Sequence, residues 1–265
     1  MGVTPPWWRA PLARLGAWRE QRALARRAIP DDLWALVLAR LPFLARLDAA
    51  DQAELRRLCS LFLDRKQFHG AGGLAVTDEM ALLVDAQACL PVLRMGLHFY
   101  DGFVGIVMHP DEVVARRQVM DDDGIVHEYD ENLTGEAMSG GPLMLAWSDV
   151  DAAAEGAALA YNVVIHEFAH VIDMASGPVD GVPPLPDTAA RERWIGVIDT
   201  AYEHFCALVE DGVETVIDPY GAEAVEEFFA VAVEAFFVAP APMRQESPAL
   251  YALLADYFRQ DPAVA

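Results

Sequence analysis

Residues 161–174 read YNVVIHEFAHVIDM and contain the pattern H-E-x-x-H, which begins at His166 and ends at His170. Positions i and i+4 of an α-helix differ by about 40° around its axis, so both imidazoles project from one face and can share a metal ion. Glu167 lies about 100° from His166, where its carboxylate can contact water on that ion without binding the ion itself. The apolar residues around the pattern predict a buried helix. Two structural histidines in a buried helix are the competing interpretation, but the pattern favours a metal.

A catalytic zinc ion needs a third protein ligand, which has to come from elsewhere in the chain. Residues 215–240 carry Glu227 and Glu234 in an almost wholly apolar helical run, where an acidic side chain needs a partner. The two glutamates are two turns apart and about 20° from each other around the helix axis. One is therefore expected at the metal, and the other behind a ligand or at the surface. The spacing favours Glu227 but leaves Glu234 open.

Two more polar side chains are candidates for supporting roles. Tyr220, seven residues before Glu227, is the nearest candidate for a hydroxyl beside the metal, and a structural tyrosine in a turn is an equally good interpretation. Asp173, three residues after His170, can orient a histidine ring. A charge pair or an anchor for the following loop would explain Asp173 equally well.

Composition excludes several classes of protein. The chain has 265 residues, 54% of them hydrophobic and 23% charged, which excludes disorder over most of its length. The formal net charge of −22 argues against sequence-independent binding to nucleic acid or anionic lipid. Three cysteines without paired spacing suit a reducing compartment and not a disulfide scaffold. We find no secretory signal and no run of about 18 apolar residues, so we expect a cytoplasmic protein without a transmembrane helix.

Hydrophobic periodicity predicts a mostly helical chain with a few central strands. Helices are expected at 33–44 (with Asp31 as the N-cap), 49–62, 78–95, 152–176, 189–211, 221–238 and 248–259, and strands at 103–108 and 143–147. The acidic residues 121–134 predict a surface loop or hairpin, and the proline-rich residues 177–188 a loop. Because strands and helices do not alternate as in βαβ units, the predicted fold class is α+β.

Arginines are concentrated at the N-terminus. Residues 1–46 carry eight arginines and three acidic residues, so residues 1–28 are expected to form a basic arm ahead of a single domain at 29–265. Such an arm can lie on a membrane surface. A solvated arm, or one that packs against the acidic body of its own chain, is the favoured alternative.

Several stretches fit one family pattern. They are residues 62–70 (F-L-x-x-K-x-F-x-G), residues 86–93 (AQACLPVL), Gly135-Glu136-Ala137, Gly141-Pro142 with Trp147, residues 162–174 and residues 220–237. Over roughly residues 30–260 the chain thereby resembles the Mlc titration factor A family, the glucose-regulated zinc peptidases of bacteria. This set of stretches is far more specific than H-E-x-x-H alone, and the basic N-terminal residues are the part it covers least.

The resemblance implies a zincin-like metallopeptidase region related to the catalytic domain of anthrax lethal factor. Together with the periodicity, this gives an expected fold that is α+β and predominantly helical, with a small central sheet and an N-terminal helical subregion. By the same resemblance His166, His170 and Glu227 hold Zn²⁺. Glu227 thereby becomes a much stronger candidate for the third ligand than Glu234. Tyr220 is then the hydroxyl that stabilises the oxyanion. The enteric family member is a partner of a sugar-uptake repressor, so a transcriptional repressor joins a peptide substrate as an expected partner.

The leading hypothesis is a zinc metallopeptidase in which Glu167 takes a proton from the metal-activated water. Aminopeptidase action is one form of this activity, which the sequence does not separate from endopeptidase action. The strand at 143–147 is expected to act as an edge strand that pairs with an extended peptide. The alternatives are a zinc-stabilised protein that sequesters a repressor with little or no hydrolysis, and a membrane-surface protein led by the basic arm.

Overall fold

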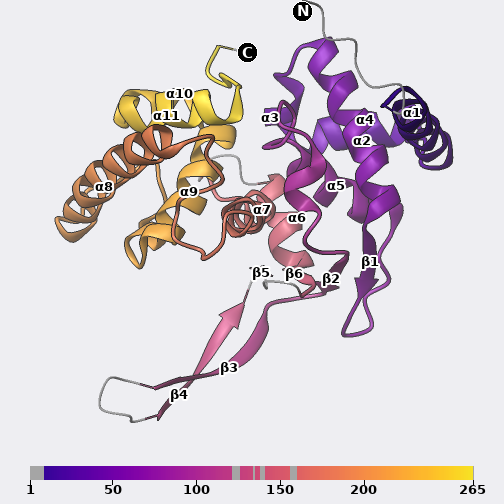
Figure 1. Ribbon diagram of the computed structural model, residues 1–265. Coiled ribbons are helices and arrows are strands. Elements are labelled where there is room, and N and C mark those ends of the chain that lie inside the picture. Colours follow the sequence, from indigo (N-terminus) through magenta and orange to yellow (C-terminus); the bar gives the residue numbers. More distant parts are fainter. Residues whose placement is uncertain (1–8, 121–125, 134, 138–140, 156–159, 265) are drawn as a thin grey trace, which may run out of the picture.

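The computed structural model describes residues 9–120, 126–133, 135–137, 141–155 and 160–264 (Figure 1). The helices in these ranges are α1 (Arg9–Arg26), α2 (Asp31–Arg40), α3 (Pro42–Ala45), α4 (Ala49–Arg65), α5 (Asp78–Cys89), α6 (Trp147–Glu155), α7 (Val163–Met174), α8 (Thr188–Glu210), α9 (Val225–Val238), α10 (Pro240–Glu246) and α11 (Pro248–Phe258), with short 3₁₀ helices η1 (Leu97–Tyr100) and η2 (Pro219–Ala222). The strands are β1 (Gln67–Gly70), β2 (Gly105–His109), β3 (Val113–Met120), β4 (Val126–Leu133), β5 (Gly135–Ala137) and β6 (Leu143–Ala146). The predicted α+β class with predominant helix and a small sheet is confirmed.

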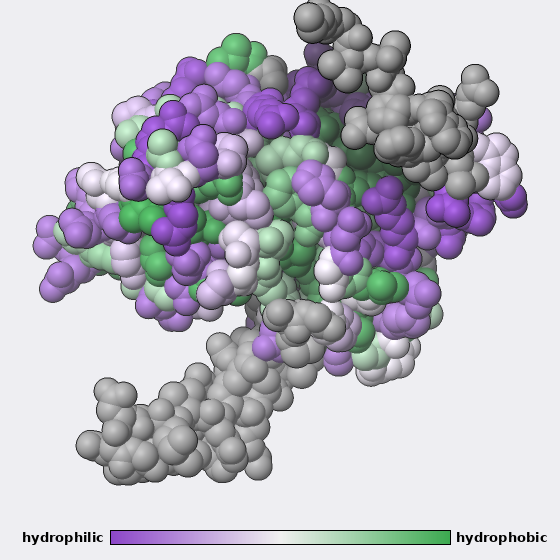
Figure 2. Space-filling view, viewed as in Figure 1, coloured by the Kyte–Doolittle hydropathy of each residue, from purple (hydrophilic) through white to green (hydrophobic). Residues whose placement is uncertain are grey.

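Helix α7 lies between two groups of helices, with α2, α4 and α5 on one side and α8, α9 and α11 on the other (Figure 1). On the face shown in Figure 2, hydrophobic residues gather towards the middle of the molecule and hydrophilic residues cover its periphery. The sheet lies alongside α7, which contacts β5 and β6, and the antiparallel β3–β4 hairpin extends away from the rest. The hairpin falls partly in the predicted acidic loop or hairpin, of which residues 121–125 and 134 lie outside the described residues.

The four-stranded sheet has the order β1-β2-β6-β5. The β1–β2 and β2–β6 pairs are parallel, and β5 runs antiparallel to β6. The predicted strands at 103–108 and 143–147 therefore exist, but β6 is bordered on both sides. The expectation that it serves as an edge strand is wrong, because the short β5 covers its free side. Strand β1 was not predicted, since its sequence QFHG leads into a glycine-rich stretch that reads as a turn.

Several predicted helices differ in extent from the helices of the structure. The helix expected at 33–44 breaks at Leu41, because the following Pro42 disfavours helical dihedrals at the residue before it. Asp31 is the first helical residue and not the N-cap, a position that Pro30 takes without a side-chain hydrogen bond. The helix expected at 78–95 ends earlier, at Cys89.

The helix expected at 152–176 is two helices, α6 and α7. Before α7, Ala160 has a φ of 52°, which is incompatible with a continuous right-handed helix. Asn162 then caps α7, because its side chain accepts a hydrogen bond from the Ile165 amide at 2.9 Å. This break sets the start of α7 at Val163, three residues before the first metal-ligand candidate, His166.

The described part of the basic N-terminal arm is helix α1, which contacts α4. Arg26 forms an ion pair with Asp64 at 2.6 Å, and Glu20 pairs with Arg57. This is the packed-back alternative for residues 9–26, whereas the division into an arm and a single domain stays a prediction. None of the helices in the described residues combines the length and apolar character needed to cross a bilayer.

Aromatic packing under α7 fixes the helix to the sheet side of the core. Phe168 is fully buried, and its ring centroid lies 5.8 Å from that of Phe62, 4.9 Å from that of Tyr100 and 5.9 Å from that of Phe103. The buried ammonium of Lys66 donates to the backbone carbonyls of Tyr100 and Phe103, and burial lowers its pKa to about 8. Because Phe168 follows Glu167, this packing also determines how the H-E-x-x-H face is presented.

Truncation of Phe168 to alanine is expected to reduce the free energy of unfolding by about 3–5 kcal/mol, since it removes a buried ring and leaves a cavity. Urea denaturation in the presence of a chelator measures this without a contribution from metal binding. Val104→Ala, at an exposed position, is the control and should change the free energy by less than about 0.5 kcal/mol. Equal effects of the two substitutions would contradict the packing described here.

Candidate metal centre

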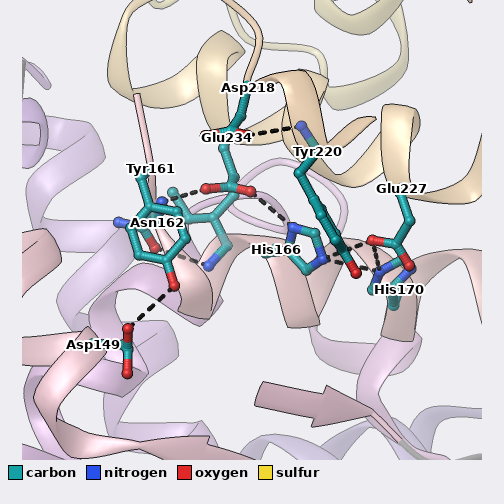
Figure 3. Close-up of polar contacts among 10 residues, drawn as sticks. Asp149, Tyr161, Asn162, His166, His170, Asp218, Tyr220, Glu227 and Glu234 are labelled. Atoms are coloured by element: carbon teal, nitrogen blue, oxygen red, sulfur yellow. Dashed lines mark hydrogen bonds and ion pairs between the residues drawn. The ribbon is translucent and has the colours of Figure 1, made fainter. Parts of the chain in front are cut away.

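Helix α7 places His166 and His170 on one face, as the i and i+4 spacing predicts (Figure 3). Their Nε2 atoms are 3.1 Å apart, and both rings are largely buried. The opposite face of α7 carries the large apolar side chains that enter the core. The two imidazoles are therefore held at a spacing that suits two ligands of one ion.

Glu227 comes from the first turn of α9 and completes a triangle with these nitrogens (Figure 3). Its Oε2 atom lies 3.1 Å from Nε2 of His166 and 3.4 Å from Nε2 of His170. Ligands about 2.0–2.1 Å from a tetrahedral zinc ion are separated by about 3.3 Å, close to all three distances. This Oε2 atom is buried and, within the described residues, has no hydrogen bond of its own. The donor set thus fits a divalent cation.

Glu234, the other candidate, lies on the far side of the His166 ring. Its Oε1 atom is 2.8 Å from Nδ1 of His166, and its Oε2 atom accepts a hydrogen bond from the Asn162 amide. A proton on Nδ1 that is donated to Glu234 leaves the Nε2 lone pair directed towards Glu227. The side chain of Asn162 also donates to Oε1 of Gln87 at 2.6 Å, so the N-cap of α7 is tied to α5. Gln87 was not predicted from the sequence, although an amide within the apolar run 86–93 was a signal for it.

Opposing effects set the protonation of the buried triangle. Burial by itself lowers the pKa of His166, but its contacts with Glu227 and Glu234 outweigh burial and raise that pKa well above the ordinary value. Burial raises the pKa of Glu227, yet the two imidazoles beside it bring that pKa down to about 2. The Glu227 carboxylate is therefore ionised near neutral pH. Protons compete with a cation for the imidazoles, so metal affinity should rise with pH.

Glu167 is buried beside the triangle and against strand β5. Burial raises its pKa, and the neighbouring imidazoles only partly offset this. A methyl group added at Gly135 would lie 2.5 Å from Oε1 of Glu167, closer than any unstrained contact. Glycine at 135 therefore leaves the space that the Glu167 carboxylate occupies. In the sequence, Gly135 stood out only as part of the family pattern.

Tyr220 lies in η2 and directs its side chain towards the triangle (Figure 3). Its ring centroid is 6.1 Å from that of His166, and 44% of the residue is exposed. The next residue, Gly221, is buried against α9, where an added Cβ atom would lie 2.6 Å from Val231 and 3.1 Å from the backbone of Phe228. The missing side chain at 221 thus lets the turn approach α9 closely enough to place the Tyr220 phenol beside the centre.

Asp173 anchors the loop that follows α7 and makes no hydrogen bond to a histidine ring in the described residues. Its Oδ2 atom accepts from the amides of Asp180 at 3.1 Å and Gly181 at 2.7 Å. Burial raises its pKa to about 6, against the lowering effect of the Gly181 amide. Of the three roles considered for Asp173, the structure supports the loop anchor, and Nδ1 of His170 stays without a hydrogen-bond partner in the described residues.

The sequence is similar to those of known proteins over most of its length. The sequence pattern of the glucose-regulated metallo-peptidase M90 family matches residues 15–259. The chain is 33% identical to Mlc titration factor A of Salmonella arizonae over 236 residues, which cover 88% of this chain and 92% of the relative. It is 33% identical to Mlc titration factor A of Edwardsiella ictaluri, covering 92% of both chains. An uncharacterized protein of Synechocystis is 35% identical and covers 93% of this chain and 90% of its own length.

The chain belongs to the M90 metallopeptidase family. The expected resemblance is confirmed over about nine-tenths of the sequence. Proteins of this family are metallopeptidases, so a metal site is expected in this chain. The cluster of His166, His170 and Glu227 is the candidate for that site.

Removal of Glu227 is expected to weaken zinc binding more than removal of Glu234. Glu234→Ala takes away the partner of one histidine, which lowers metal affinity by about 10- to 100-fold. Glu227→Ala takes away a ligand and should exceed that loss. Titration of the metal-free protein against a fluorescent zinc chelator measures both. Glu226→Ala, at the neighbouring position of α9, should leave the affinity unchanged, and a larger loss in Glu234→Ala than in Glu227→Ala would reverse the assignment.

Proposed function

We propose that the chain is a zinc-dependent peptidase whose metal is held by His166, His170 and Glu227. The observation that carries the proposal is the convergence of these three ligand atoms from two helices beside a buried Glu167. Two imidazoles and one carboxylate are a donor set that suits catalytic zinc. When bound, Zn²⁺ would act as a Lewis acid towards a carbonyl oxygen and would lower the pKa of a bound water molecule to about 7.

Glu167 is proposed as the general base and acid. A group is most effective in that role when its pKa is close to the working pH, and burial moves the pKa of Glu167 in that direction. The carboxylate accepts the proton of the attacking water and returns it to the leaving amine. The backbone of β5 at Gly135 packs directly against the Glu167 carboxylate and leaves it no room to move in that direction.

Tyr220 is proposed to donate its hydroxyl proton in a hydrogen bond to the oxygen that develops negative charge. Its partial exposure leaves the phenol accessible to a substrate, and the close packing of Gly221 on α9 fixes where the turn lies. One well-placed donor to such an oxygen is worth about 3–4 kcal/mol of transition-state stabilisation.

The substrate is proposed to be an extended peptide that pairs with β5, the outer strand of the described sheet next to Glu167. A cavity of about 320 Å³, lined by several apolar side chains and by His98, lies beside this strand. Ala137 of β5, Leu143 of β6, and Val171 and Met174 of α7 contribute to its wall. A hydrophobic side chain of the peptide fits this cavity, so we propose that such a residue lies near the cleaved bond.

The Glu167→Gln variant tests the peptidase proposal. It keeps the size of the side chain but removes the base, so turnover of chromogenic peptides should fall by about 10²–10⁴-fold while the zinc content stays that of the unmodified chain. Loss of wild-type activity on chelation and its return with Zn²⁺ is the control. Full activity of Glu167→Gln, or peptide cleavage that survives chelation, would refute the proposed mechanism.

The contact between Gly135 and Glu167 predicts a separate effect on kcat. In Gly135→Ala the added methyl group displaces the Glu167 carboxylate, and a misplacement of about 1 Å costs on the order of 10²-fold in rate. Zinc content should not change, because the three ligands are untouched. Gly196→Ala, on α8 with no atom near the added methyl, is the matched control. Equal kcat values for the two variants would show that β5 does not position the base.

We also propose a regulatory protein, of the transcriptional-repressor class, as a partner. The support is the name of the relatives, Mlc titration factor A, which refers to the titration of Mlc. The Glu167→Gln variant separates the two functions, since a sequestering role persists after turnover is lost and a purely proteolytic role does not.

A further inference from the structure

A second group of potential metal ligands lies between α4 and α5, away from the centre described above. Cys59 comes from α4, and Asp85 and Cys89 come from α5, one helical turn apart. All three residues are fully buried. One ligand atom of each lies within 4.8 Å of the other two, and Sγ of Cys89 is 3.5 Å from Oδ1 of Asp85.

Asp85 is the unexplained member of this group. Its Oδ1 atom accepts a weak hydrogen bond from the Cys89 thiol, but its Oδ2 atom is buried and has no hydrogen-bond partner in the described residues. Nor does any basic side chain there form an ion pair with it. A carboxyl group in an apolar interior is unfavourable unless it is paired or coordinates a metal.

We propose that Cys59, Asp85 and Cys89 bind a second, structural Zn²⁺ ion. A thiolate about 2.3 Å and a carboxylate oxygen about 2.0 Å from a tetrahedral zinc ion are separated by about 3.5 Å, which is the distance between Cys89 and Asp85. The Oδ2 atom of Asp85 can serve as a fourth ligand atom if the carboxylate binds through both oxygens. Two thiolates and one carboxylate leave a net charge of −1, as in Cys₃His sites.

The position of this cluster gives the ion a structural role. It would cross-link α4 to α5, two helices that pack together on one side of α7. Gln87, two residues after Asp85, accepts the hydrogen bond from Asn162, the N-cap of α7. The ion would therefore stabilise the helix on which the start of α7 rests. Since all three residues are buried, metal is expected to enter as the chain folds and not by exchange at the surface.

Metal analysis of the full chain tests this inference. Protein purified under reducing conditions with Zn²⁺ should hold about two zinc ions per chain, and a His166→Ala/His170→Ala variant about one. Cys59→Ala and Asp85→Ala should each lower the wild-type content to about one. Cys206→Ala is the matched control, because this half-buried thiol lies outside the cluster and should leave the content unchanged.

Cobalt substitution gives a readout that does not depend on the buried variants folding. The His166→Ala/His170→Ala variant refolded with Co²⁺ should show thiolate-to-cobalt charge-transfer absorption in the near ultraviolet, which a site of histidines and glutamate lacks. Absence of that band, together with about one zinc ion in the wild-type chain, would overturn the inference. A disulfide between Cys59 and Cys89 in peptide mapping of the purified chain would also overturn it. Neither result bears on the His166, His170 and Glu227 centre.

Discussion

The contact on which the site depends is the packing of α7 against α9. Each helix alone presents an incomplete set: α7 supplies two imidazoles, and α9 supplies carboxylates in an otherwise apolar helix. Their packing brings Glu227 to the Nε2 atoms and Glu234 to Nδ1 of His166, so one helix provides both a ligand and the partner that orients another ligand. Burial of these charges is tolerable only because the contacts are made together.

Local spacing was sufficient to predict what lies on α7, because i and i+4 neighbours share a face whatever surrounds the helix. It was not sufficient to decide between Glu227 and Glu234, which lie about 20° apart on one helix face. Which of them lies at Nε2 depends on where along its length α9 packs against α7. That position is set by tertiary packing, and the local sequence carries no signal for it. The family resemblance favoured Glu227, and it is the Oε2 atom of Glu227 that lies 3.1 Å from Nε2 of His166. Asp173 illustrates the same limit, since its partners are the amides of Asp180 and Gly181 in a loop of irregular backbone.

The two predicted helices that the structure interrupts share a physical cause. Apolar periodicity continues across the breaks at Leu41 and Ala160, whereas Pro42 and the positive φ of Ala160 interrupt the backbone there. The role of β6 was misjudged because the three-residue strand β5 is too short to be recognised from alternation. Yet β5 is the element that contacts Glu167. Its contact residue, Gly135, has no side chain, so the sequence carries no signal for this contact.

Anomalous diffraction at the zinc absorption edge, from crystals of the full chain grown with Zn²⁺, tests the central claim most directly. An anomalous peak is expected about 2.0–2.2 Å from Nε2 of His166, Nε2 of His170 and a carboxylate oxygen of Glu227. No peak at this position, or a peak bonded to the two histidines with Glu227 turned away from it, would contradict the account.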